Sequence, residues 1–305
     1  MGQRFHTISF LSDLGVVDEH VGVVHAIVRD LSPHVSVVDL THAVAPYDVR
    51  GGSLTLARAI GYVPSGVVLA AVDAGPESGR PLVAIEVAAG EGVFVGPDNG
   101  LLAPAVAMAG GAERCVLLSD VSFHLASAGG PFAVRDVLAP VAAHLCNGVD
   151  LAELGDVVDA DTLLPGVVPL PRPLSAGSDG VVPEGVIAEV LWIDRVGNSQ
   201  LNIGLDDVSP WALVEGQRIM AVAGDVSRVA ERVAHAGRLG AGSVGLVVDA
   251  YGMLSLVLER RSAADELALA TADQVTLTPL APDDRGPGAS SPVTLRTGPQ
   301  RGPAR

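Results

Sequence analysis

The chain has 305 residues, and a chain of this length is expected to divide into two domains. Hydrophobic residues make up 49% of it but aromatic residues only 3%, so the core must consist mainly of Val, Leu and Ala. The formal net charge is −16. An acidic surface repels phosphate backbones, which excludes nucleic acid as an expected partner but is compatible with a small cationic ligand.

Cysteine spacing and hydropathy indicate a soluble, cytoplasmic protein. Cys115 and Cys146 form no CxxC motif and no metal-ligand spacing, so we expect both to be buried and reduced, with no metal bound. The residues after Met1 lack the regions of a signal peptide. No apolar run reaches the roughly 18 residues of a membrane helix, so no membrane partner is expected.

The first half of the chain alternates strand-like and helix-like segments. Apolar runs predict strands at 6–11, 35–40, 66–72 and two within 82–95. Apolar residues at helical spacing predict helices at 19–31, 51–60 and 136–146. This alternation predicts an N-terminal α/β domain at 1–165, with a mostly parallel sheet and flanking helices.

The second half has a different pattern. Prolines separated by Gly and Ser predict an interdomain linker at 166–183. Strand-like runs without long helices then predict a smaller C-terminal β-barrel domain at 184–280. The residues 281–305 are rich in Pro, Gly, Ser and Arg, and we expect them to form a disordered tail.

Acidic residues follow two of the predicted strands at their carboxyl ends, where parallel sheets bind ligands. Asp13 follows the first strand and Asp73 the third. Taken alone, each acidic motif has a structural alternative. Asp13 could cap the next helix, and Asp194 with Asn198 could form a turn of the barrel.

Five blocks of sequence occur in a characteristic order. They are S-D-L-G at 12–15, the segment from Asp73 to Arg80, G-P-D-N-G-L-L at 96–102, F-A-V-R-D-V-L-A-P at 132–140 and D-R-V-G-N at 194–198. Together they resemble the S-adenosylmethionine hydroxide adenosyltransferases and their relatives, the fluorinase and chlorinase. The resemblance runs from about Ile8 to about Leu269. It implies an N-terminal α/β domain, a C-terminal β-barrel and a homotrimer with its active site at the subunit interface.

The resemblance also implies which residues bind the substrate, S-adenosyl-L-methionine. Asp13 would hold the ribose hydroxyls, with Tyr47 beside the ribose and adenine, and Asp194 and Asn198 would contact the methionine portion. One carboxylate can accept both vicinal hydroxyls of a ribose, and a second carboxylate suits the ammonium group of the amino acid. The displaced sulfonium leaves as a neutral group, so the reaction is expected to need no general acid. We expect no cofactor, because S-adenosyl-L-methionine is itself the substrate.

The nucleophile is expected to be water. Asp73 and Arg80 match two members of the Asp, Arg and His set that water-using members of the family carry. A carboxylate would repel a halide, but it can accept a hydrogen bond from water. This favours hydrolysis to adenosine and L-methionine by attack at ribose C5′, with Arg80 orienting Asp73. The structural alternative is a loop salt bridge between Asp73 and Arg80.

The third member of that set is missing, because Ala133 stands where the family has His, and Val134 where it has Gly. His124 is one candidate to fill the vacated space. Three functions therefore stay open: a hydrolase acting on the sulfonium C–S bond, a halogenase-like enzyme, and a protein that binds S-adenosylmethionine or adenosine but has lost turnover.

Overall fold

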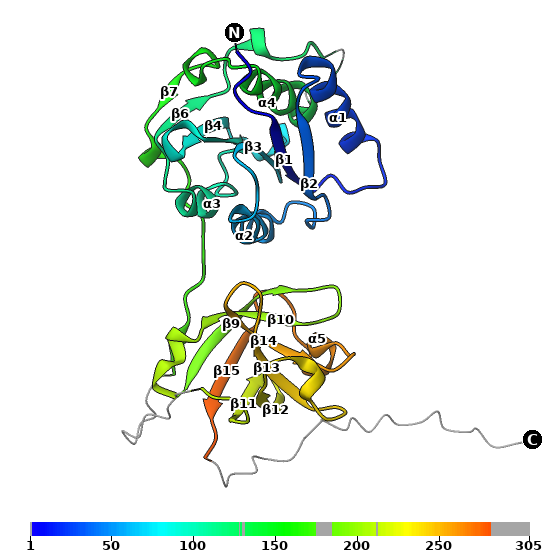
Figure 1. The fold of residues 1–305 in the computed structure, drawn as a ribbon, viewed down its shortest axis with the longest axis vertical. Coiled ribbons are helices and arrows are strands. Elements are labelled where there is room, and N and C mark those ends of the chain that lie inside the picture. Colours follow the sequence, from blue (N-terminus) through cyan, green and yellow to red (C-terminus); the bar gives the residue numbers. More distant parts are fainter. Residues whose placement is uncertain (1, 128, 130–131, 175–184, 212, 282–305) are drawn as a thin grey trace, which may run out of the picture. The chain divides into compact units, whose positions relative to one another are not determined.

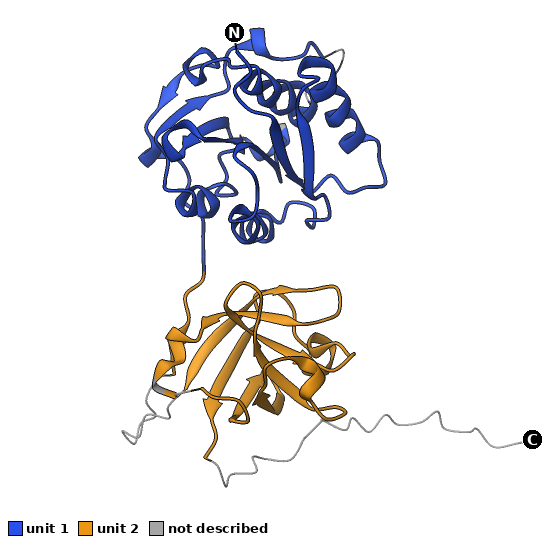
Figure 2. Cartoon of the chain, viewed as in Figure 1, with its two compact units in different colours: residues 1–168 blue, residues 169–305 orange. Residues whose placement is uncertain are grey.

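The structure of the chain is a computed structural model that describes residues 2–127, 129, 132–174, 185–211 and 213–281. The chain divides into two compact units, residues 1–168 and 169–305 (Figure 2). The second half of the predicted linker and the predicted tail after Ala281 lie outside the described residues. Among the described residues, no helix is both long and apolar enough to span a bilayer.

Unit 1 is built on a seven-stranded sheet with the strand order β2-β1-β3-β5-β4-β6-β7. The strands are β1 Thr7–Ser12, β2 Ser36–Thr41, β3 Gly66–Ala71, β4 Leu82–Val87, β5 Gly92–Pro97, β6 Arg114–Leu117 and β7 Val157–Val158. Strands β2, β1, β3 and β5 are parallel, whereas β4, β6 and β7 continue the sheet in antiparallel pairs. The predicted α/β class is confirmed.

Helices cover both faces of this sheet (Figure 1). They are α1 His20–Leu31, α2 Val49–Ile60, α3 Ala103–Met108 and α4 Ala139–Cys146, the last preceded by a π-helical turn at Val134–Leu138. Because side chains of a strand alternate between faces, Leu69 packs in the core under α1 and α4, and its neighbour Val68 packs under α2 and α3. All the residues of β3 are buried, as expected of a central parallel strand.

Unit 2 is a closed β-barrel of seven strands, and the predicted β-barrel is confirmed. Its sheet has the order β10-β14-β13-β12-β11-β15-β9-β8, and an additional β9–β10 pairing closes the barrel, with β8 at the edge of β9. The strands are β8 Arg172–Pro173, β9 Val186–Ile193, β10 Ser199–Gly204, β11 Arg218–Ala223, β12 Val226–Arg232, β13 Val244–Val248, β14 Met253–Leu258 and β15 Gln274–Pro279. A short helix, α5 Ala263–Leu267, follows β14.

The buried residues of strand β10 are partly polar, so hydropathy alone does not predict this strand. Gln200 and Asn202 are almost fully buried. The Gln200 Nε2 atom donates to Asp249 Oδ2 at 2.6 Å, and Asn202 Oδ1 accepts the backbone N–H of Glu189 at 2.7 Å. These hydrogen bonds offset the cost of burying polar groups, and hydropathy alone does not reveal them.

Candidate active site

Loops at the carboxyl ends of β1, β2 and β3 are joined through one carboxylate, that of Asp13. The Asp13 Oδ2 atom accepts the backbone N–H of Tyr47 at 3.0 Å and the backbone N–H of Asp73 at 3.2 Å. Both donor residues have positive φ angles, 65° at Tyr47 and 51° at Asp73. A left-handed backbone is uncommon for residues other than glycine and is often found at functional sites. Asp13 therefore joins two loops to its own turn and does not cap the N-terminus of α1, where Glu19 is the N-cap residue.

The S-D-L-G block folds as a tight turn after β1. Gly15 has a φ angle of 72°, which a residue without a Cβ adopts freely, and its N–H donates to the His42 carbonyl at 2.8 Å. The backbone N–H of Asp13 donates to the Ala71 carbonyl at 3.2 Å, and that of Leu14 donates to Ser12 Oγ at 3.3 Å. Neighbouring strand ends thus hold the turn from both sides.

These loops line an open cavity of about 340 Å³, at the lower end of the range for small-molecule sites. Asp13, Tyr47, Asp73 and Ala133 all line it, so the structure brings four of the residues discussed above together. Glu77 adds a third carboxylate to the lining, and the described chain contributes no basic side chain to it. This charge favours a cationic ligand.

The carboxylates of Asp13 and Asp73 are available to a ligand. Within the described chain, Asp13 Oδ1 accepts no hydrogen bond, and no hydrogen bond or ion pair reaches the Asp73 carboxylate. Arg80 is exposed and does not line the cavity. Among the described residues its guanidinium pairs with no acid, and its backbone N–H donates to Ser78 Oγ at 3.3 Å. In the described residues Arg80 therefore forms no ion pair with Asp73.

Ala133 stands at the start of the π-helical turn that forms one wall of the cavity. Buried Asp136 fixes this turn, because its Oδ2 atom accepts the Phe132 N–H at 2.9 Å and its Oδ1 atom lies 2.6 Å from Arg135 Nε. The hydrogen bond from Arg135 lowers the pKa of the Asp136 carboxyl. Single-turn π-bulges are frequent at functional sites. His124 does not line the cavity, so it does not fill the space beside Ala133.

Asp194 and Asn198 lie in unit 2, in the turn between β9 and β10. Asp194 Oδ1 accepts the backbone N–H groups of Val196 and Asn198, both at 2.9 Å, and Asp194 Oδ2 accepts Asn198 Nδ2 at 2.8 Å. Gly197 has a φ angle of 88°, and a Cβ there would clash with Ser262. The structure brings these two predicted residues into contact with each other.

The G-P-D-N-G-L-L block supports the site without lining it. Asn99 Nδ2 donates to the Val72 carbonyl at 3.0 Å, directly before Asp73, and Asn99 Oδ1 accepts the Leu101 N–H at 3.1 Å. Asp98 Oδ1 accepts the Leu164 N–H at 2.8 Å. These bonds hold the end of β3, from which Asp73 projects.

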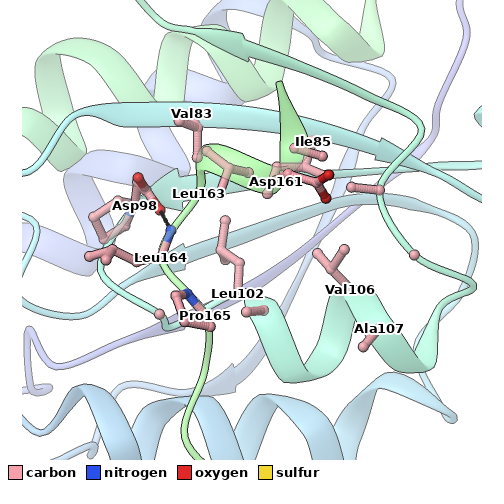
Figure 3. Close-up of a pocket in the computed structure, with 16 residues that line it drawn as sticks. Val83, Ile85, Asp98, Leu102, Val106, Ala107, Asp161, Leu163, Leu164 and Pro165 are labelled. Atoms are coloured by element: carbon pink, nitrogen blue, oxygen red, sulfur yellow. Dashed lines mark hydrogen bonds between the residues drawn. The ribbon is translucent and has the colours of Figure 1, made fainter. Parts of the chain in front are cut away.

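A second cavity of similar volume lies between β4, β5, α3 and the segment around Leu163 (Figure 3). Its wall is mainly aliphatic, with Val83, Leu102 and Val106 among the lining residues. None of the predicted substrate-binding residues lines it. The cavity beside Asp13 is therefore the better candidate for the active site.

Glu77 and Phe132 were missed as lining residues by sequence reasoning. Both fall inside the blocks that carry the family resemblance, so that resemblance was the signal that could have found them. The Phe132 ring lies 4.8 Å from the His20 ring and 5.7 Å from the Arg135 guanidinium. These contacts place the residue before Ala133 between α1 and the π-helical turn.

The chain thus combines an α/β unit, which has an acidic cavity at its strand ends, with a β-barrel unit. Residues 8–155 match the family model of the SAM hydroxide adenosyltransferase N-terminal domain. The chain is 37% identical to the (R)-S-adenosyl-L-methionine hydrolase of Salinispora tropica, over 89% of this chain and 97% of the relative. It is 26% identical to a fluorinase of an Actinoplanes species, over 60% of this chain and 67% of the relative.

A solved structure shows the same fold. An uncharacterized conserved protein from Thermotoga maritima superposes with a TM-score of 0.77 at 27% identity, covering 89% of this chain and 99% of that one. The chain therefore belongs to the SAM hydroxide adenosyltransferase family, as its sequence blocks indicated.

Proposed function

We propose that this protein hydrolyses S-adenosyl-L-methionine to adenosine and L-methionine by attack of water on ribose C5′. The observation that carries the proposal is the Asp73 carboxylate, which lines an acidic cavity and has no partner among the described residues. A negative charge there disfavours a halide nucleophile and provides a hydrogen-bond acceptor for water. The similarity to a relative named as a hydrolase supports the same reaction.

The displacement requires that the water is aligned with C5′ and that a nearby group accepts the proton of the water. The water oxygen forms a bond to C5′ while the C5′–S bond breaks, and the electron pair goes to sulfur, which leaves as the neutral thioether of methionine. The water loses one proton, for which Asp73 is the proposed acceptor. Arg80 belongs to the same loop, and we propose that it orients Asp73 when substrate is bound. No cofactor is needed for this displacement.

Asp13 and Tyr47 are the proposed ribose and adenine contacts. The Asp13 Oδ1 atom accepts no hydrogen bond within the described part of the chain, and it can accept the ribose hydroxyls while Oδ2 continues to hold the two loops. Tyr47 is 76% exposed beside the cavity, and an aromatic ring in this position can cover the ribose and adenine.

Asp194 and Asn198 are the proposed contacts to the methionine portion. They belong to unit 2, whereas Asp13 belongs to unit 1, and the proposed assembly is a homotrimer in which each active site takes residues from two chains. Val16 and Val17 in the loop after Gly15 are 78% and 94% exposed, and a neighbouring subunit would remove this apolar surface from water.

The proposed location is the reducing cytoplasm. Both cysteines are buried and form no disulfide. Burial raises the pKa of the Cys146 thiol to about 12, so this thiol is protonated and unreactive in the folded protein. A free, inert thiol suits a compartment in which disulfides do not form.

The test is the product formed by the full-length protein from S-adenosylmethionine in water enriched in oxygen-18, with and without chloride, analysed by chromatography and mass spectrometry. We expect labelled adenosine in equal amounts under both conditions. A 5′-chloro product that depends on chloride would replace the proposal with a halogenase-like activity.

A second candidate is a protein that binds the ligand without turnover. The small Ala133 side chain at the cavity wall favours it, because the resemblance places a catalytic His there. Tight binding of S-adenosylmethionine in calorimetry, with no adenosine formed over many hours, would support this candidate.

A further inference from the structure

A buried polar network lies directly behind the Asp13 turn. Ser12 Oγ lies 2.8 Å from His42 Nδ1, and both side chains are almost fully buried. The His42 ring packs against Phe10, with the ring centroids 4.6 Å apart. Ser12 is therefore shielded from solvent and is not itself a nucleophile for an external substrate. Its hydroxyl is a structural connection between His42 and the turn.

His42 is linked to the turn at two points. Its ring contacts Ser12, whose Oγ atom also accepts the Leu14 N–H at 3.3 Å, and its carbonyl accepts the Gly15 N–H at 2.8 Å. Asp13 lies between these anchored residues. The direction of its carboxylate, and so of the two loops that the carboxylate holds, depends on this support.

The far side of the ring faces an acid. His42 Nε2 lies 3.0 Å from Asp39 Oδ1, an ion-pair distance, although its N–H is not aligned for a good hydrogen bond. Asp39 Oδ1 also lies 2.9 Å from His25 Nε2. Partial burial raises the pKa of the Asp39 carboxyl, but the two imidazoles more than offset this and leave the pKa below its ordinary value.

One neutral tautomer of His42 fits its contacts with both Asp39 and Ser12. With the proton on Nε2, the ring faces the Asp39 carboxylate with a donor, and Nδ1 accepts the Ser12 hydroxyl proton. Ser12 Oγ then remains an acceptor for Leu14. The other neutral tautomer would turn a lone pair toward the carboxylate.

We propose that His42 is a positioning residue for the reaction, which orients the Asp13 carboxylate toward the ribose through the Ser12 hydroxyl. This inference rests on the proposed function, because the ribose contact of Asp13 belongs to it. His42 touches no substrate and acts only through the turn. The part of the ring that matters is Nδ1, and the contact of Nε2 with Asp39 is secondary.

Two amide variants of His42 distinguish the contribution of Nδ1 from that of Nε2. In His42→Asn the side-chain oxygen reaches the position of Nδ1 and can accept the Ser12 hydroxyl, whereas in His42→Gln the amide lies one carbon further out, near Nε2. Both variants remove the imidazole beside Phe10, so they are matched in lost packing. His25→Gln alters the contact with Asp39 alone and serves as a control.

We expect His42→Gln to weaken adenosine binding roughly 5- to 30-fold in calorimetry, the range for a lost buried hydrogen bond. His42→Asn and His25→Gln should remain within about threefold of the wild type. Ser12→Ala should match His42→Gln, and the double variant should be no weaker than either single one, because both changes break the same connection. Equal weakening by His42→Asn and His42→Gln, or wild-type binding by His42→Gln, would overturn the inference.

Amide hydrogen exchange of Leu14 and Gly15 in the ligand-free protein separates this inference from the proposed function. We expect exchange about tenfold faster in His42→Gln and near the wild-type rate in His42→Asn. Wild-type protein that binds neither adenosine nor S-adenosylmethionine overturns the proposed function and, with it, the role of His42 toward ribose. Wild-type protein that binds adenosine, together with unchanged exchange in His42→Gln, overturns the positioning role alone.

Discussion

Asp13 in unit 1 and Asp194 in unit 2 both bind backbone N–H groups, but at very different distances along the chain. Asp13 uses one oxygen to hold Tyr47 and Asp73, which are 34 and 60 residues away, and its other oxygen accepts no hydrogen bond within the described chain. Asp194 uses both oxygens within its own five-residue turn, which ends at Asn198.

The comparison shows that an aspartate can either join loops that are distant in the sequence or close a local turn. Asp13 joins separate loops and keeps an open lone pair, so its replacement should affect the ligand first. Asp194 satisfies nearby backbone donors, so its replacement should affect folding of the barrel first. The following variants test this division, in order of expected effect.

Asp73→Asn should reduce the rate of adenosine formation by roughly two to four decades, the range for a positioned acid–base group. The amide keeps the size of the side chain but is a weaker acceptor for a water proton. Steady-state kinetics with chromatographic detection measures the change, and calorimetry with adenosine should show nearly unchanged affinity. An unchanged turnover number would remove Asp73 from the mechanism.

Asp13→Asn should weaken adenosine binding about 10- to 100-fold, because a charged hydrogen bond to ribose contributes about 1.5–3 kcal/mol. The amide oxygen can still hold the two loops, so the melting temperature should fall only slightly. Calorimetry and thermal denaturation measure the two effects. A large loss of stability with unchanged affinity would mean that the role of Asp13 is structural.

Asp194→Ala should destabilise unit 2 by about 1–3 kcal/mol, because it leaves backbone donors of the turn without a partner. Chemical denaturation followed by Trp192 and Trp211 fluorescence, both in unit 2, measures the change. Asp225→Ala, at an exposed position of the same unit, is the matched control and should have little effect. Should affinity for methionine fall while stability stays constant, the ligand role of Asp194 would outweigh its role in the turn.

Asp136→Asn tests the wall of the cavity through its pH dependence. The hydrogen bond from Arg135 lowers the folded-state pKa of Asp136 below its ordinary value of 3.8, so the ionised carboxylate stabilises the fold above that pH. This contribution disappears as the pH falls through the folded-state pKa. We expect the variant to be less stable than the wild type at pH 7, with the difference shrinking in acid. Urea denaturation at several pH values measures it, and a constant difference would contradict the assignment.

Glu77→Gln should have the smallest effect, a loss of roughly two- to fivefold in affinity for S-adenosylmethionine, because Glu77 is exposed and its charge is screened. Neutral adenosine should bind as before. Calorimetry with both ligands at low and high salt distinguishes a charge effect from a change of shape. Equal losses for both ligands would exclude electrostatic attraction as the cause.

The sequence by itself determined the architecture and the positions of two acidic residues. Apolar periodicity located the strands before Asp13 and Asp73, and the rules of parallel sheets put both residues at one edge. The five ordered blocks identified the family. Each of these features is contained in a short segment of the sequence, so it can be recognised without knowledge of the fold.

Only the tertiary structure decided how the site is held. The left-handed backbone at Tyr47 and Asp73 is not marked by glycine, and it is stabilised by a carboxylate far away in sequence. The Ser12–His42 contact likewise spans 30 residues. Such contacts form because packed strand ends bring distant loops within hydrogen-bond distance, a condition that depends on the whole sheet and not on any segment of it.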